Sequence, residues 1–268
     1  MKKLWVLVVF VAGCQFAAGS SRPARPVTPG LAPAEAQAKA PGDAALLPGD
    51  AVVSGVAQHY PETIRPALQI IKVREGIHKV SAMYMIVTRK GDVFFLSDVA
   101  VNIEPTAEDL AEIALCTAQE ARRFNMEPRV AMLSFSNFGS TVHPQCEKVR
   151  RAVSLVRQAD PMLMIDGEMM ADTATVPEIL KEYPFSTLQG SANILVFPDL
   201  QSGNIAYKLL TRLGGAEAIG PVLMGMSKPV HVLQRGSSVE EIVNISALAV
   251  VDAQELAKAK TKVAMTAK

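Results

Sequence analysis

The residues best suited to chemistry lie close together near the carboxyl-terminal end of the chain. Arg235 follows an apolar run and comes immediately before Gly236 and Ser237, which lead into a predicted helix. Backbone N–H groups at a helix N-terminus and a forked guanidinium both bind phosphate oxygens well. Arg235 is therefore a candidate phosphate ligand, although an exposed surface arginine would also fit this position.

Glu241 lies in the first turn of the same predicted helix and has two interpretations. A carboxylate within reach of a bound thiol or hydroxyl could accept its proton. The sequence from Ser238 to Glu241 also fits a capping box, in which Glu241 would bond back to the Ser238 amide. The residues alone leave both interpretations open.

Three weaker candidates lie elsewhere. Ser202 and Asn204 open another predicted helix, where free amides could hold a phosphate or an ordinary serine cap could form. Arg65 could face a cleft, although arginines on amphipathic helices are often simply solvated. The four histidines have no ligand spacing such as H-E-x-x-H, and neither standard phosphate-loop motif is present. We therefore expect no metal site and no resident cofactor.

Strands and helices alternate in the pattern from residue 51 onward. Apolar, β-favouring runs predict strands over residues 51–56, 80–88, 93–97, 129–135, 162–165 and 193–197. The polar turn at residues 89–92 predicts that the second and third of these form an antiparallel pair. Helices are expected over residues 61–71, after Thr106, from Pro144, over residues 205–213 and from about Ser238.

The apolar residues of the last two helices are expected to face the core. They are Ile205, Ala206, Leu209, Leu210 and Leu213 in the first, and Ile242, Val243, Ile245 and Ala249 in the second. The predicted strands do not alternate strictly between apolar and polar residues. This indicates a mostly parallel sheet covered by helices on both faces, that is, a three-layer α/β fold. Ligands of such sheets bind beyond the carboxyl ends of the strands. The loops 134–140, 166–168, 198–204 and 234–238 are therefore the places to look for function.

Several of these segments carry a resemblance to a known family. Residues 134–140 (SFSNFGS), 166–168 (DGE), 192–199 (ANILVFPD), 203–208 (GNIAYK), 213–216 (LGGA) and 219–221 (IGP) resemble, in order and spacing, the phosphate acetyltransferase and butyryltransferase family. Residues 228–244 look most like the carboxy-terminal domain of bacterial NADP-dependent malic enzymes. That domain is thought to bind acetyl-CoA as a regulator.

The resemblance implies roles for three residues. Family acetyltransferases catalyse attack of the CoA thiol on acetyl phosphate, using a serine, an arginine and an aspartate. Here these positions read Gln234, Arg235 and Glu241. Arg235 would bind phosphate, Glu241 would take the thiol proton, and Gln234 would donate a hydrogen bond. Ser136, Ser202, Asn204 and Arg65 are the candidate contacts to CoA or phosphate.

The resemblance also implies a two-lobed, phosphotransacetylase-like architecture and a homo-oligomer. Family members carry further chain before the segment matching residues 51–56, so the first lobe is expected to be incomplete here. The catalytic part of malic enzyme has no counterpart either, so we expect no malate oxidation from this chain alone.

The first fifty residues differ from the rest. Residues 1–20 combine two lysines, an apolar run and Cys14, which resembles a signal segment with a lipidation site. Residues 21–50 are a linker rich in proline and alanine. The predicted domain covers residues 51–256, and residues 257–268 are expected to form a polar tail. The membrane would be a partner only if Cys14 is lipidated.

Composition narrows the function classes. The net charge is +1 and aromatic residues make up 5%, which argues against nucleic-acid binding.

The interpretation we prefer from the sequence is an acetyl-CoA-binding domain of malic-enzyme type, regulatory or catalytically impaired. An active phosphate acyltransferase and a lipid-anchored periplasmic α/β binding protein are the alternatives. The family resemblance implies the cytoplasm, whereas the leader implies a membrane anchor.

Overall fold

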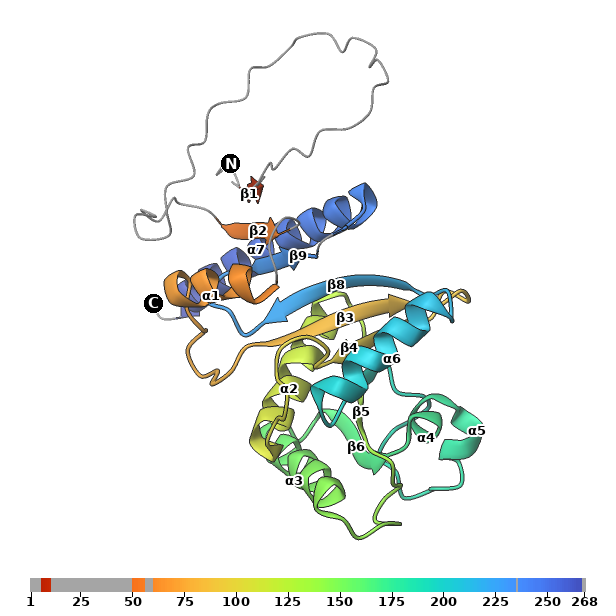
Figure 1. Ribbon diagram of the computed structural model, residues 1–268. Coiled ribbons are helices and arrows are strands. Elements are labelled where there is room, and N and C mark those ends of the chain that lie inside the picture. The colour runs from red at the N-terminus through yellow and green to blue at the C-terminus, as the bar shows by residue number, and fades with distance from the viewer. Residues whose placement is uncertain (1–5, 11–49, 56–59, 235, 267–268) are drawn as a thin grey trace, which may run out of the picture.

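One mixed sheet forms the centre of the molecule. The structure, a computed structural model, describes residues 6–10, 50–55, 60–234 and 236–266. Its strands follow the order β1-β2-β9-β8-β3-β4-β7-β5-β6 (Figure 1). Their bounds are β1 Val6–Phe10, β2 Ala51–Gly55, β3 Ser81–Val87, β4 Val93–Ser97, β5 Arg129–Leu133, β6 Met164–Met169, β7 Ile194–Val196, β8 Glu217–Met224 and β9 Val230–Leu233.

Parallel pairing dominates this sheet. Among the described strands, the parallel neighbours are β1 with β2, β2 with β9, β4 with β7, β7 with β5 and β5 with β6. Strand β3 runs antiparallel to both β4 and β8, and β8 runs antiparallel to β9. The predicted hairpin across residues 89–92 and the mostly parallel sheet are both confirmed.

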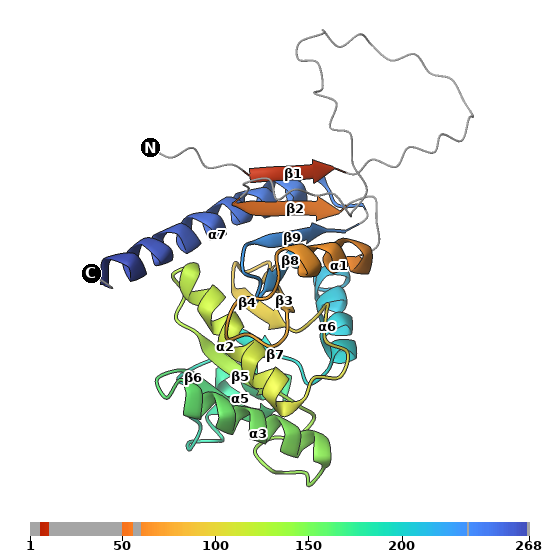
Figure 2. The same cartoon turned by 90° about the vertical axis from the view of Figure 1, so that its left-hand side faces the viewer.

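Helices cover both faces of the sheet (Figure 2). Their bounds are α1 Tyr60–Ile70, α2 Ala107–Arg123, α3 Pro144–Ala159, α4 Ala171–Thr175, α5 Pro177–Leu180, α6 Leu200–Arg212 and α7 Val239–Thr266. One core joins the sheet to α2, α3 and α7, and two smaller clusters lie under α6 and α1 on the opposite face. The predicted three-layer α/β class is therefore confirmed.

Helix α6 corrects the expected apolar face. Ile205, Leu209 and Leu213 are exposed by 57%, 51% and 79%, and Leu210 by 40%, whereas Gly203 and Tyr207 are buried. The reason is close packing, because a Cβ at Gly203 would lie 2.6 Å from the backbone oxygen of Asp98. The face of α6 that contains Gly203 packs against the sheet. The face that carries the larger apolar side chains is therefore exposed to solvent.

Helix α7 agrees with the prediction in part. Ile245 and Ala249 are buried as expected, but Val243 is 59% exposed and does not belong to the core-facing row. Leu248 and Ala253 complete the buried row in its place. The helix also continues through Thr266, so most of the segment expected as a polar tail is helical.

Strand β6 extends into a region expected to be a loop. It continues through Asp166, Gly167 and Glu168, where sequence patterning predicted a strand ending at Ile165. The Asp166 carboxylate accepts hydrogen bonds from Arg157 at 2.9 Å and from the Thr187 amide at 2.7 Å. These partners satisfy a polar side chain inside the strand. The short helices α4 and α5 and the strands β8 and β9 were not predicted.

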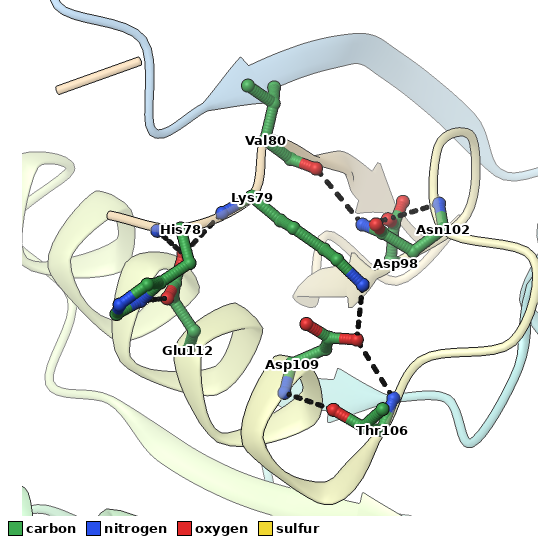
Figure 3. A network of polar contacts seen from close by, with 8 residues as sticks. All are labelled: His78, Lys79, Val80, Asp98, Asn102, Thr106, Asp109 and Glu112. Atoms are coloured by element: carbon green, nitrogen blue, oxygen red, sulfur yellow. Dashed lines mark hydrogen bonds and ion pairs between the residues drawn. The ribbon is translucent and has the colours of Figure 1, made fainter.

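A polar network anchors α2 to the start of β3 (Figure 3). Thr106 and Asp109 form a capping box at the predicted helix start, with bonds of 3.1 and 3.0 Å. Lys79 donates to Asp109 at 2.7 Å, and Glu112 accepts from the backbone amides of His78 and Lys79. The network fixes the entry to β3, a strand that contributes to the floor of the pocket described below.

Asp98 organises the loop that follows β4. Its carboxylate accepts from the amides of Ala100, Val101 and Asn102, and Asn102 also donates to the Val80 carbonyl at 3.0 Å (Figure 3). Burial raises the pKa of Asp98 although these donors act in the opposite direction. This loop therefore carries a structural carboxylate.

The predicted leader is only partly described. Val6–Phe10 forms β1 and pairs in parallel with Ala51–Gly55. Cys14 and residues 21–49 of the predicted linker lie outside the described residues. Within the part of the chain that the structure describes, no helix is both long and apolar enough to cross a membrane.

Candidate functional site

A pocket of about 680 Å³ opens between α6 and the start of α7. Residues of β3 and β8 and the end of β9 supply its floor, and the turn from β9 into α7 supplies one wall. The lining residues are Tyr84, Tyr207, Lys208, Thr211, Arg212, Ala216, Glu217, Ala218, Ile219, Gly220, Gln234, Gly236, Ser237, Ser238, Glu240, Glu241 and Asn244. Two of the residues predicted to do chemistry, Gln234 and Glu241, therefore share one pocket.

Gln234 follows directly after β9. Its side-chain amide Nε2 donates to the hydroxyl of Tyr84 at 2.7 Å, and its backbone oxygen accepts from the Ser237 amide at 3.2 Å. Arg235, which comes next in the chain, lies outside the described residues. Its neighbours Gln234 and Gly236 both line the pocket.

Glu241 takes part in the capping box that its sequence context suggested. Its Oε2 accepts from the Ser238 amide at 2.7 Å, and the Ser238 hydroxyl accepts from the Glu241 amide at 3.1 Å. These bonds hold the carboxylate at the N-terminus of α7, where the helix dipole favours negative charge. The same carboxylate lines the pocket, so the cap and a chemical role are compatible.

Two cations on α6 line the opposite wall, and sequence reasoning did not single them out. Lys208 and Arg212 lie one helical turn apart. The Lys208 Nζ lies 5.9 Å from the centroid of the Tyr207 ring. These two side chains place positive charge on this wall, while Glu217, Glu240 and Glu241 also line the pocket. The one-turn spacing of Lys208 and Arg212 was a usable signal in the sequence.

Tyr84 and Tyr207 contribute a stacked pair of aromatic rings to the pocket lining. Their rings stack with centroids 4.4 Å apart and planes at 16°. Tyr84 comes from β3 and Tyr207 from α6, so more than a hundred residues of chain separate them. No local sequence pattern could have paired these rings.

Ser136 is held in a different environment. It is fully buried, donates to Glu168 Oε1 at 2.9 Å and accepts from the Thr141 amide at 3.1 Å. Arg150 pairs with the same Glu168 oxygen at 3.0 Å. These bonds organise the loop after β5, and Ser136 is not among the residues that line the pocket.

The remaining predicted contacts also lie away from the pocket. The Ser202 amide donates to Asp199 Oδ1 at 2.8 Å, so Asp199, not a serine, caps α6. Asn204 donates to the Val99 carbonyl at 3.2 Å, and Arg65 is exposed on α1. The structure therefore brings together Gln234 and Glu241, but not these three residues.

Comparison with known proteins agrees with this architecture. A family model described as phosphate acetyl/butaryl transferase matches residues 44–250. The phosphate acetyltransferase of Bacillus subtilis (strain 168) is 46% identical over 198 residues, which cover 74% of this chain and 61% of that protein. The NADP-dependent malic enzyme of Escherichia coli (strain K12) is 48% identical over 208 residues, covering 76% of this chain and 27% of that protein.

A solved structure shows the same fold. The phosphotransacetylase of Streptococcus pyogenes superposes with a TM-score of 0.73 at 45% identity, covering 78% of this chain and 64% of that one. This chain thus spans less than two thirds of the length of these phosphotransacetylases. By its family match, its sequence identity and its fold, the chain belongs to the phosphate acetyl/butaryl transferase family.

Proposed function

We propose that this protein binds acetyl-CoA in the pocket between α6 and α7 and transfers the acetyl group between CoA and phosphate. The observation that carries the proposal is the meeting of Gln234 and Glu241 with the cations Lys208 and Arg212 in one pocket. Family membership supplies the class of reaction, and the pocket supplies groups of the kinds that it needs.

The reaction assigns one task to each side of the pocket. The CoA thiol gives its proton to the Glu241 carboxylate, and the sulfur bonds to the acetyl carbonyl carbon of acetyl phosphate. The bond between that carbon and the phosphate oxygen then breaks, and phosphate leaves with the electron pair. In this proposal Arg235 binds the phosphate, because a guanidinium forks onto two of its oxygens.

CoA carries its own phosphates at the end remote from the thiol. In the proposed complex, Lys208 and Arg212 bind these phosphates from α6, which leaves the thiol directed toward the start of α7. The N-terminal end of the α7 dipole also favours an anion at this end of the pocket. The stacked rings of Tyr84 and Tyr207 line the same pocket.

The test is phosphate-dependent release of CoA from acetyl-CoA by the purified full-length chain. We expect release that saturates with both substrates and that falls by at least about 100-fold in Arg235→Ala. Lys181→Ala, on an exposed position outside the pocket, is the control. Absence of release from a folded protein that also fails to bind acetyl-CoA would contradict the proposal.

A second candidate is a binding domain that senses acetyl-CoA without transferring its acetyl group. The observation in its favour is that Glu241 is engaged in the capping box and Gln234 in a bond to Tyr84. Saturable binding of acetyl-CoA without release of CoA would support this function. The same titration therefore separates the two candidates.

We further propose that the protein is a homo-oligomer located in the cytoplasm. The exposed apolar row of Ile205, Leu209 and Leu213 on α6 is suited to contact with a second copy. Light scattering on the purified chain tests the oligomer, and sequencing of the mature N-terminus tests whether Cys14 is lipidated. A monomer that is processed at Cys14 would contradict both parts.

A further inference from the structure

We propose that Lys208 is a site of self-acetylation, where acetyl phosphate bound in the pocket without CoA transfers its acetyl group to the Lys208 Nζ. The inference rests on the proposed function, because it takes acetyl phosphate as a ligand of this pocket. The modification would limit the same reaction whenever acetyl phosphate exceeds CoA. The observation that carries it is the presence of one amine and one guanidinium on the same wall of the pocket.

Lys208 supplies the amine of this pocket. Among the described residues that line it, no other side chain carries a primary amine. The Nζ lies 5.9 Å from the centroid of the Tyr207 ring, a distance at which the face of an aromatic ring attracts an ammonium group. Tyr207 belongs to the lining too, so this contact keeps the amine at the pocket wall. Lys208 is also exposed, so a small molecule can reach it.

Arg212 supplies a binding group for the phosphate of the acetyl donor. It lies one helical turn after Lys208, and the β-carbons of residues so spaced are about 5–6 Å apart. A guanidinium binds two oxygens of a phosphate group as a fork. In acetyl phosphate a single bridging oxygen joins the phosphorus to the carbonyl carbon. A phosphate held by Arg212 therefore brings this carbon within reach of the Lys208 amine.

The transfer needs no reactant besides acetyl phosphate. The ammonium group of Lys208 first loses one proton to water, and the nitrogen then bonds to the acetyl carbonyl carbon through its lone pair. The bond between that carbon and the bridging oxygen breaks, and phosphate leaves with the electron pair. A second proton passes from the nitrogen to this phosphate. The product is an uncharged amide on the Lys208 side chain.

CoA and acetyl phosphate compete for this wall of the pocket. In the proposed transfer complex Lys208 and Arg212 bind the phosphates of CoA, and Arg235 binds the phosphate of the acetyl donor. Bound CoA therefore covers the Lys208 amine and protects it. Acetylation removes the positive charge of the side chain, so the modified protein binds CoA more weakly.

Mass spectrometry of the purified full-length chain measures the rate at which acetyl phosphate acetylates each lysine, and two lysines outside the pocket are the controls. Lys90 is exposed in the turn between β3 and β4. Lys148 donates to the Pro198 carbonyl at 2.8 Å, and burial lowers its pKa, which favours the uncharged, reactive amine. Lys148 therefore shows what reactivity alone would select, and Lys208 shows what binding in the pocket would select.

We expect Lys208 to be acetylated at least about tenfold faster than Lys90 and Lys148, because binding holds the donor beside this amine. The rate should saturate with acetyl phosphate, and CoA at about ten times its dissociation constant should slow it by about tenfold. Arg212→Gln should remove the preference for Lys208. Acetyl-CoA should show no such preference, because in the proposed complex its acetyl group lies at the end remote from Lys208.

Calorimetry on the acetylated protein measures the effect on CoA binding. We expect the treated wild type to bind CoA about tenfold more weakly than the untreated protein, and to match Lys208→Gln, which lacks the same charge. Lys208→Arg keeps the charge and carries no amine at this place, so its CoA affinity should be the same before and after treatment. Thermal unfolding midpoints check that each variant is folded.

Equal acetylation of Lys208 and Lys90, or faster acetylation of Lys148, would overturn this inference. Acetylation of Lys208 that leaves CoA affinity unchanged would overturn it as well. In either case, phosphate-dependent release of CoA by the same protein would leave the proposed function standing. Preferential, saturable acetylation of Lys208 in a protein that neither binds nor releases CoA would support this site and contradict the proposed function.

Discussion

At the residue scale Glu241 has an observed capping role and a proposed chemical role, and one substitution separates them. A glutamine can still complete a capping box with Ser238, because its side-chain oxygen accepts from the same amide. It cannot accept a thiol proton as a carboxylate does. The change Glu241→Gln therefore isolates the chemical role that the sequence left open.

We expect Glu241→Gln to lower kcat by about 100-fold, as loss of a general base does, while the free energy of unfolding changes by less than about 0.5 kcal/mol. Steady-state kinetics and urea unfolding measure the two quantities. Ser238→Ala is the reciprocal variant, and loss of the cap should lower the free energy of unfolding by about 1 kcal/mol. Full activity of Glu241→Gln would exclude this carboxylate as the base.

Lys208 and Arg212 give a second prediction at this scale. We expect Lys208→Gln and Arg212→Gln each to weaken CoA binding by about tenfold, because each removes a charged donor to phosphate. Calorimetry measures the affinity, and the loss should shrink as salt is added. Lys90→Gln, in the exposed turn between β3 and β4, is the control and should bind normally. Equal affinity in all three variants would place the CoA phosphates elsewhere.

The sequence identified part of this site for a physical reason. Gln234 and Glu241 lie close together in the chain at positions that the family resemblance singled out, and both line the pocket. Tyr84 and Tyr207 meet only because β3 lies beside β8 and α6 crosses the same sheet. The sequence alone could not place them together. Ser202 and Asn204 were candidates because helix starts attract anions, but the Asp199 carboxylate occupies that position.

Helix α6 shows how an element can be predicted while its orientation is missed. The apolar spacing of Ile205, Leu209 and Leu213 correctly indicates a helix, yet the side that packs contains Gly203 and Tyr207. Hydrophobic periodicity gives weight to large side chains and gives none to a glycine. Close approach of two backbones is therefore the determinant that the pattern could not reveal.

That explanation makes a prediction about Gly203. We expect Gly203→Ala to lower the free energy of unfolding by about 1–3 kcal/mol, because its Cβ would lie 2.6 Å from the Asp98 carbonyl oxygen. Urea unfolding measures the change. Gln201→Ala, at an exposed position of the same helix, should be nearly neutral. If Gly203→Ala were as stable as the wild type, close packing would not explain the orientation of α6.

At the scale of the whole molecule, alternating elements were enough to predict a three-layer α/β fold with a mostly parallel sheet. The strands β8 and β9 were not predicted, although they lie inside the sheet, between β2 and β3, and contribute to the floor of the pocket. The sequence before β8 has glycines and that before β9 a proline, so neither run stood out as a regular strand. The position of the pocket became visible only once these strands were placed.

The central claim is that acetyl-CoA binds in the pocket between α6 and α7. Hydrogen exchange with and without acetyl-CoA tests this claim most directly. On the full-length chain we expect acetyl-CoA to slow exchange in α6, residues 200–212, and in residues 236–244, which form the turn before α7 and its first helical turns. Exchange in the loop 134–140 around Ser136 should stay unchanged. Protection of that loop, with none at α6 or at the start of α7, would contradict this account.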